Sequence, residues 1–176
     1  MRALIFAVAA LGACASTPAP ATQIHYTTTL SGAQDPTNTG SAATGTARID
    51  VDTATQTIDA QIEIHGLQMS ALSAHLSHAP MGPMHLHRYQ GDDVTLILPF
   101  PMGSTYVATA DGFTVTLHHY AYTDGAAIVQ SGLSFDQFLA ALDHDPIFLN
   151  IHTERFGDGE ISGRLTRART VVALPR

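Results

Sequence analysis

The sequence predicts an all-β domain, an antiparallel Greek-key β-sandwich or barrel with one short helix near residues 134–142. Three observations lead to this class. Apolar and polar residues alternate with a period of two along several segments, as in strands with one buried face. Turn-forming pairs such as Asp111-Gly112 separate these segments. Many short strands with one brief helix are typical of sandwiches and barrels.

The first half of the domain contains three expected strands, at residues 23–30, 46–52 and 57–65. The third shows the clearest alternation, because its apolar residues share one face and its polar residues share the other. The apolar set is Ile58, Ala60, Ile62 and Ile64. Residues 53–56 are expected to form the turn before this strand.

The second half combines strands with a loop and a helix. Pro80 and Pro83 predict a loop over 69–84, with one helical turn near 70–75. Ser134 and Gln137 have the spacing of a capping box, which predicts a helix ending at 141 or 142. Further strands are expected at 84–89, 94–98, 106–110, 113–122, 147–153 and 160–166.

The N-terminus has the pattern of a bacterial lipoprotein signal. A short apolar run after Arg2 leads into Leu11-Gly12-Ala13-Cys14, which predicts a signal peptide over 1–13 and lipidation of Cys14. Ordinary cleavage at the small residues, giving a soluble periplasmic or secreted protein, is the alternative. The rest is expected to divide as follows: a flexible linker at 14–24, one β-domain at 25–168 and a C-terminal tail at 169–176.

Charge and motifs exclude several classes of function. The formal net charge of −7 disfavours nucleic acid and anionic lipid as partners, so we expect membrane contact only through a lipid anchor. Walker, Rossmann, EF-hand and G-x-S-x-G patterns are absent. The chain has one cysteine and 10 histidines, so imidazole nitrogen is the natural metal ligand.

His85 and His87 form an H-x-H pair within an expected strand. Residues two apart on a strand point to the same face, with attachment points about 6.6 Å apart. Two imidazoles at that spacing can converge on one metal ion. The other interpretation is a pair of exposed histidines on a polar face.

His152 shares its expected strand face with Phe148 and Asn150, whereas Leu149 and Ile151 face the other way and are the better core candidates. Its side chain is either a third metal ligand or a histidine anchored by Thr153 or a backbone carbonyl.

Other histidines are lesser candidates for metal binding. His75 and His78 lie in the loop before the H-x-H pair, and His118 lies on the more polar face of an expected strand. His118 and His119 are expected on opposite faces of that strand, so that at most one of them can join a given site.

Three stretches resemble the chordin-type (CHRD) domain family. They are Leu30-Ser31-Gly32-Ala33-Gln34-Asp35-Pro36 with Ala43-Thr44-Gly45-Thr46-Ala47, His85-Leu86-His87, and Phe148-Leu149-Asn150-Ile151-His152-Thr153 with Gly159-Glu160-Ile161-Ser162-Gly163. The resemblance covers residues 25–166 and implies an extracytoplasmic all-β fold. The chain departs from the family pattern at Ser162, where the family has arginine, and in the histidine-containing segment 69–84.

The order of His85, His87 and His152 is also similar to the arrangement in copper/zinc superoxide dismutases, which place an H-x-H pair and a later histidine on strands of a Greek-key barrel. We therefore expect a metal site, with copper favoured and zinc as the alternative, and superoxide dismutase-like redox activity. Arg155 or Arg164 would guide a small anion. The competing hypothesis is a non-enzymatic envelope module with a structural histidine cluster.

Overall fold

The computed structural model describes residues 23–168. The expected signal peptide, the lipidation site at Cys14, linker residues 14–22 and the tail lie outside the described residues. The first strand, β1, begins at Gln23, so the described chain enters the sheet at once. No helix within the described range is long and apolar enough to cross a membrane.

The ten strands of the described range belong to one sheet, and every pair of neighbours is antiparallel. The strands are β1 (Gln23–Ser31), β2 (Thr44–Asp52), β3 (Thr57–His65), β4 (Met84–Gln90), β5 (Asp93–Phe100), β6 (Tyr106–Ala108), β7 (Gly112–Ala121), β8 (Ile147–Ile151), β9 (Ile161–Arg164) and β10 (Thr166–Arg167). Their order is β5-β4-β8-β9-β1-β2-β3-β7-β6, with β10 beside β1. The predicted antiparallel β class is confirmed.

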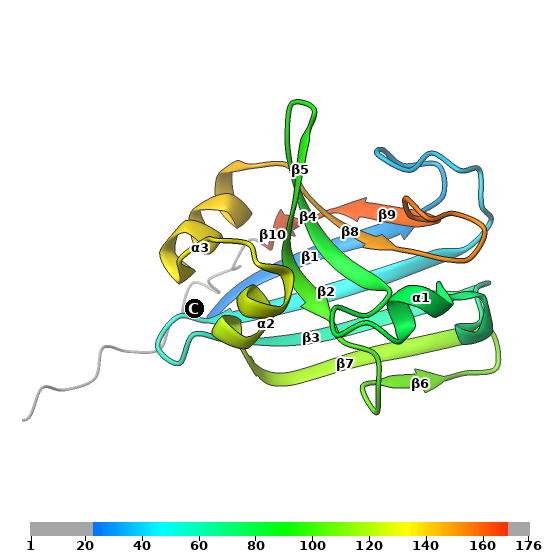
Figure 1. Ribbon diagram of the computed structural model, residues 1–176, viewed down its shortest axis with the longest axis horizontal. Helices are drawn as coiled ribbons and strands as arrows, with labels where there is room; N and C mark the ends of the chain where they lie inside the picture. The colour runs from blue at the N-terminus through cyan, green and yellow to red at the C-terminus, as the bar shows by residue number, and fades with distance from the viewer. Residues whose placement is uncertain (1–22, 169–176) are drawn as a thin grey trace, which may run out of the picture.

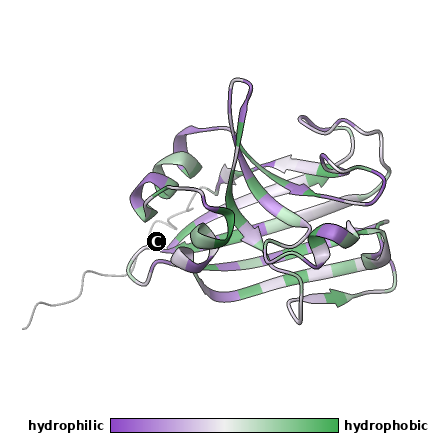
Figure 2. Ribbon diagram, viewed as in Figure 1, coloured by the Kyte–Doolittle hydropathy of each residue, from purple (hydrophilic) through white to green (hydrophobic). Residues whose placement is uncertain are grey.

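The sheet curls so that β4 and β5 pass in front of β1 and β2 (Figure 1). The core lies between these two parts of the same sheet. One side chain in two points inward along β2 and β3, for example Ile49 and Ile62, both fully buried. Figure 2 shows the alternation as green and purple bands along the strands. The period-two pattern of the sequence therefore identifies the core face correctly.

Between residues 23 and 168, four short helical segments accompany the sheet: η1 (Met69–Ala71), α1 (Ala74–Ser77), α2 (Tyr122–Val129) and α3 (Phe135–His144). The predicted helix corresponds to α3, and the capping box between Ser134 and Gln137 is present. The first two segments replace the single helical turn expected near 70–75.

The helix α2 was not expected from the sequence. Its N-cap, Ala121, makes no side-chain capping bond, and Gly125 lies within it, so local signals are weak. Gly125 packs so closely on the sheet that an added Cβ atom would lie 3.0–3.1 Å from Tyr120, Leu98 and Pro99. Tertiary packing therefore stabilises this helix, and the preceding strand ends at Ala121.

Candidate metal centre

The strand β4 is buried on both faces near its start. It lies between β5 and β8, with Met84 and Leu86 in the hydrophobic core. His85 and His87 point to the opposite face, yet only 2% and 8% of their surfaces are exposed. The interpretation of this pair as exposed histidines on a polar face is therefore wrong.

The strand β8 brings His152 to the same place. Met84 of β4 pairs with Ile151, the last residue of β8, so His152 follows directly beyond the start of the H-x-H strand. The backbone N–H of His152 donates to the Pro83 carbonyl over 2.9 Å, and its carbonyl accepts from Ser73 N–H over 3.1 Å. The segment 69–84 thus fixes the backbone of the third histidine.

The three imidazoles converge in space. Their ring centroids are 5.6 Å apart for His85 and His87, 5.0 Å for His85 and His152, and 5.4 Å for His87 and His152. The Nε2 atoms of His87 and His152 are 3.3 Å apart. Each histidine offers one nitrogen within 4.8 Å of the other two. Among the described residues, this is the only group of three or more His, Cys, Asp or Glu side chains so close together.

The proton arrangement of His152 follows from one contact. Its Nδ1 is 2.7 Å from the carbonyl oxygen of Gly157, which can only accept, so Nδ1 carries the hydrogen. In the neutral ring, Nε2 then carries no hydrogen, and its lone pair is directed at His87. The sequence left two roles open, a metal ligand or a histidine anchored by Thr153 or a backbone carbonyl, and the structure shows the carbonyl contact at Nδ1 with Nε2 left 3.3 Å from His87 Nε2.

Hydrogen bonding within the described chain leaves the other two rings poorly satisfied. Both ring nitrogens of His85 and Nδ1 of His87 are buried without a partner there. Each such group costs about 1–3 kcal/mol when it is removed from water. A cluster built only for structure would be expected to pair these nitrogens.

Burial keeps all three rings neutral. It lowers the pKa of His85 to about 3, reinforced by His152 and His87 and opposed by the Gly82 backbone. It lowers the pKa of His87 to about 4, again reinforced by His152. Burial also lowers the pKa of His152, although the Gly157 carbonyl and Asp158 oppose the shift. Neutral imidazole is the form that binds metals.

Two polar residues that the sequence did not single out complete this face. Asn150 is fully buried and pairs with His85 across β4 and β8. Tyr89 stacks on His87 with ring centroids 6.3 Å apart. For Asn150, the sequence did show that it shares a strand face with His152. That face looked like an outer, polar one, so complete burial of Asn150 was not expected.

Glu160 organises the turn that carries the Gly157 carbonyl. Its carboxylate accepts from Thr153 Oγ1 at 2.9 Å and from Ser41 Oγ at 2.6 Å. Thr39 Oγ1 donates to its backbone carbonyl at 2.7 Å. The turn after β8 is therefore tied to the loop after β1.

The opening and closing sequence motifs pack directly on each other. Ser162 Oγ lies 3.0 Å from the Asp35 carbonyl and 3.1 Å from Thr37 Oγ1. A Cβ atom added to Gly163 would lie 2.2 Å from the Thr29 carbonyl oxygen. The glycine and the short hydroxyl side chain thus permit the close approach of β9 to β1 and its loop.

A model of the CHRD domain family matches residues 26–165. The chain belongs to the CHRD domain family. Comparisons with curated proteins and with solved structures gave no match. Two of the stretches that carried the resemblance in the sequence hold the histidines of this CHRD domain, His85 and His87 in one and His152 in the other.

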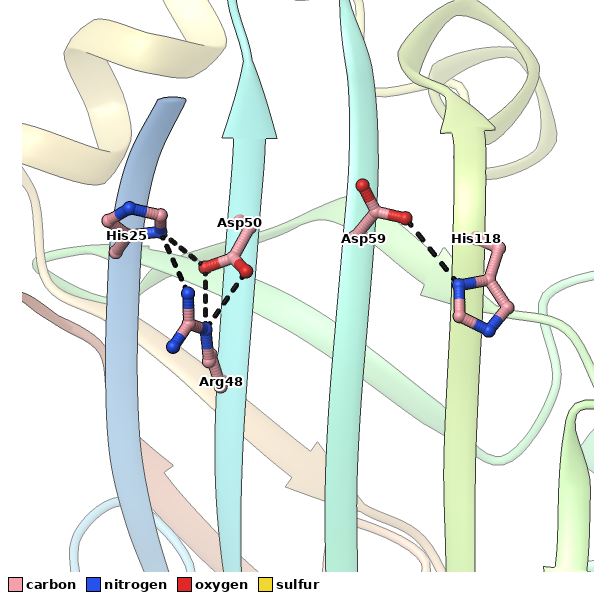
Figure 3. A network of polar contacts seen from close by, with 5 residues as sticks. All are labelled: His25, Arg48, Asp50, Asp59 and His118. Carbon is pink, nitrogen blue, oxygen red and sulfur yellow. Dashed lines mark hydrogen bonds and ion pairs between the residues drawn. The ribbon is translucent and has the colours of Figure 1, made fainter. Parts of the chain in front are cut away.

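The lesser histidine candidates lie outside the cluster. His75 and His78 of the CHRD domain are exposed on and just after α1. His118 is also exposed, and its Nδ1 is 3.7 Å from Asp59 Oδ1. Figure 3 shows it in a row across the outer face of the sheet with His25, Arg48, Asp50 and Asp59.

The prediction that His118 and His119 lie on opposite faces, so that at most one can join a given site, is wrong. A bulge places both of them opposite Asp59, because Ile58 pairs with Tyr120 whereas Ala60 pairs with Leu117. His119 has a positive φ of 49°, and its Nδ1 is 3.2 Å from the same Asp59 oxygen. Both imidazoles therefore contact one carboxylate.

The two arginine candidates lie in different places. Arg155 is exposed, with its guanidinium carbon 5.0 Å from the Phe156 ring centroid, and it lines a hollow beside Gly157 and Tyr89. Arg164 lines a different hollow, on the outer face of β1 and β2. Of the two, Arg155 is the one that shares a hollow with residues in contact with the histidine cluster.

Proposed function

We propose that this CHRD domain binds one transition metal ion through His85, His87 and His152. The observation that carries the proposal is the convergence of three buried imidazoles on one point, with the Nε2 lone pair of His152 fixed by the Gly157 carbonyl. In protein metal sites, a ligating histidine is regularly oriented by a hydrogen bond from its other ring nitrogen.

The spacing of the nitrogens supports the proposal. Tetrahedral coordination with metal–nitrogen bonds of about 2.0–2.1 Å separates neighbouring ligand nitrogens by about 3.3–3.4 Å. The Nε2 atoms of His87 and His152 are 3.3 Å apart. The ligand atoms of all three lie within 4.8 Å, so binding requires only a small inward movement of the His85 ring.

The donor set favours copper, with zinc as the alternative. Both metals accept imidazole nitrogen, and copper binds a given nitrogen site more tightly than zinc. Three protein ligands leave a position for a small exogenous ligand. We further propose that copper there cycles between Cu(II) and Cu(I) and supports superoxide dismutase-like activity.

We also propose an extracytoplasmic location in the bacterial envelope. The support is the lipoprotein-type pattern around Cys14 and the net charge of −7, which leaves a lipid anchor as the means of membrane attachment. Radiolabelled palmitate incorporation by the full chain, lost on Cys14→Ser substitution, is the expected result. Labelling that survives the substitution would contradict it.

Metal titration tests the main proposal. The full chain carrying Cys14→Ser, which removes its only thiol, is stripped with chelator and titrated with Cu(II) and with Zn(II). We expect one tightly bound Cu(II) per chain. His85→Ala and His152→Ala are each expected to weaken binding at least about 100-fold, because each removes one of three ligands.

His118→Ala is the matched control, since His118 is exposed and lies outside the cluster. Its copper affinity should equal that of the parent chain. Equal affinity in His85→Ala and His152→Ala would refute the metal site and favour the structural cluster. Copper binding without superoxide consumption would refute only the redox proposal.

A further inference from the structure

The amide of Asn150 lies beside the proposed metal site without filling its own hydrogen-bonding capacity. Asn150 pairs with His85 across β8 and β4, so both side chains project from the same face of the sheet. The residue is fully buried. Its position gives it access to the same interior space as the His85 ring.

Only one side of this amide has a partner within the described chain. Its Nδ2 donates to Tyr89 Oη at 3.4 Å, whereas Oδ1 is buried with no partner there. An unsatisfied buried carbonyl oxygen costs about 1–3 kcal/mol. That cost is offset when a molecule with a hydrogen to donate occupies the site.

A hollow of about 400 Å³ is lined by Tyr89, the residue to which the Asn150 amide donates. The turn residues Gly157, Asp158 and Gly159 and Thr37 of the loop after β1 also line it. The backbone of Gly159 lies beside the amide, because a Cβ atom added to this glycine would lie 3.6 Å from Asn150 Nδ2.

We propose that Asn150 is a positioning residue for the exogenous ligand of the metal. Its Oδ1 accepts a hydrogen bond from water, hydroxide or another small oxygen ligand that carries a proton, and Tyr89 holds the amide in that orientation. This role rests on the proposed metal site, since His85, His87 and His152 leave a coordination position for such a ligand.

The arrangement makes the site selective. An oxygen ligand with a hydrogen gains a bond to Oδ1, whereas a proton-free anion such as azide meets the negative end of the amide dipole. The proposal therefore predicts that the parent protein binds azide weakly, and that removing the Asn150 carbonyl strengthens azide binding.

Azide titration of the copper-loaded full chain, in the Cys14→Ser background, tests the role of Asn150. Leucine has the same branching as asparagine but no polar atoms. We expect Asn150→Leu to keep copper affinity within about three-fold and to bind azide about ten-fold tighter. Azide binding is measured from the azide-to-copper absorption band. Tyr89→Phe frees the amide to rotate its N–H toward azide, so we expect about three-fold tighter azide binding there.

His118→Ala is the control and should leave azide affinity unchanged. If Asn150→Leu fails to fold, Tyr89→Phe decides the outcome. Unchanged or weaker azide binding in the folded variants would overturn the role of Asn150 while leaving the metal site intact. A copper affinity that falls in Asn150→Leu as far as in His152→Ala would make Asn150 a ligand and also overturn it. A parent protein without bound copper would overturn both proposals.

Discussion

His152 donates its Nδ1 hydrogen to the carbonyl oxygen of Gly157 across 2.7 Å. This contact sets the direction of the lone pair on the other nitrogen, which faces His87 Nε2. The turn after β8 thus acts on the histidine cluster through a backbone atom that side-chain patterns do not reveal.

Replacing His85 by leucine should stabilise the metal-free protein. The substitution removes two buried nitrogens that have no partner within the described chain and keeps a similar volume. Removing such groups should raise the free energy of unfolding by about 1–2 kcal/mol. Urea unfolding in the presence of chelator measures this change, and adding Cu(II) should stabilise the parent but not the variant. A destabilised variant with well-folded spectra would contradict the prediction.

The metal-free protein should lose stability as the pH falls below about 6.5, the ordinary histidine pKa. The folded-state pKa values of His85 and His87 are lowered to about 3 and about 4, so in this range only the unfolded chain takes up protons at these sites. Each histidine then lowers the free energy of unfolding by up to about 1.4 kcal/mol for each pH unit below about 6.5, whereas above that pH it is neutral in both states and has no such effect.

Urea unfolding at several pH values between 7.5 and 4.5 measures the slope of stability against pH. The His85→Leu variant should show a shallower slope, and the difference isolates the contribution of His85 from that of other groups. Equal slopes in the two proteins would mean that His85 titrates normally in the folded state.

Thr153→Val should weaken the turn that presents the Gly157 carbonyl. Thr153 is buried. Its hydroxyl donates to Glu160 Oε2 at 2.9 Å and accepts from Phe156 N–H at 3.1 Å. We expect a loss of about 1–2 kcal/mol in unfolding free energy and about ten-fold weaker copper binding, because loss of outer partners typically costs 10–100-fold. Calorimetric titration gives the affinity. Unchanged copper affinity in a destabilised protein would separate the turn from the metal site.

Gly163→Ala should be strongly destabilising. The new Cβ atom would lie 2.2 Å from the backbone oxygen of Thr29 and 2.4 Å from Thr28 Oγ1, so β9 and β1 must separate. We expect a loss of about 3 kcal/mol, measured by thermal or urea unfolding. Gly157→Ala is the control, because its Cβ atom would meet nothing within 4 Å, and its stability should change by less than about 0.5 kcal/mol. Similar losses in both variants would contradict this assignment of the close contact.

The strands and one helix could be predicted because their signals are local. Alternation along Thr57–His65 marks a half-buried strand, and the capping box at Ser134 marks a helix start, whatever the rest of the chain does. The helix α2 could not be predicted, because its stability comes from the contact of Gly125 with Leu98 and Pro99. The bulge at His119 likewise depends on the pairing of β7 with β3.

For the candidate site, the sequence was enough to place His85 and His87 on one face of a strand and His152 on a late strand, since strand periodicity acts over a few residues. The folded chain was needed to show that β8 lies beside β4, that all three rings are buried, and that Asn150 lies with them. These features depend on pairings between residues more than 60 positions apart, such as His87 and His152. Pairing between distant strands fixes their register and the burial of the rings, and the local sequence pattern does not specify which strands pair.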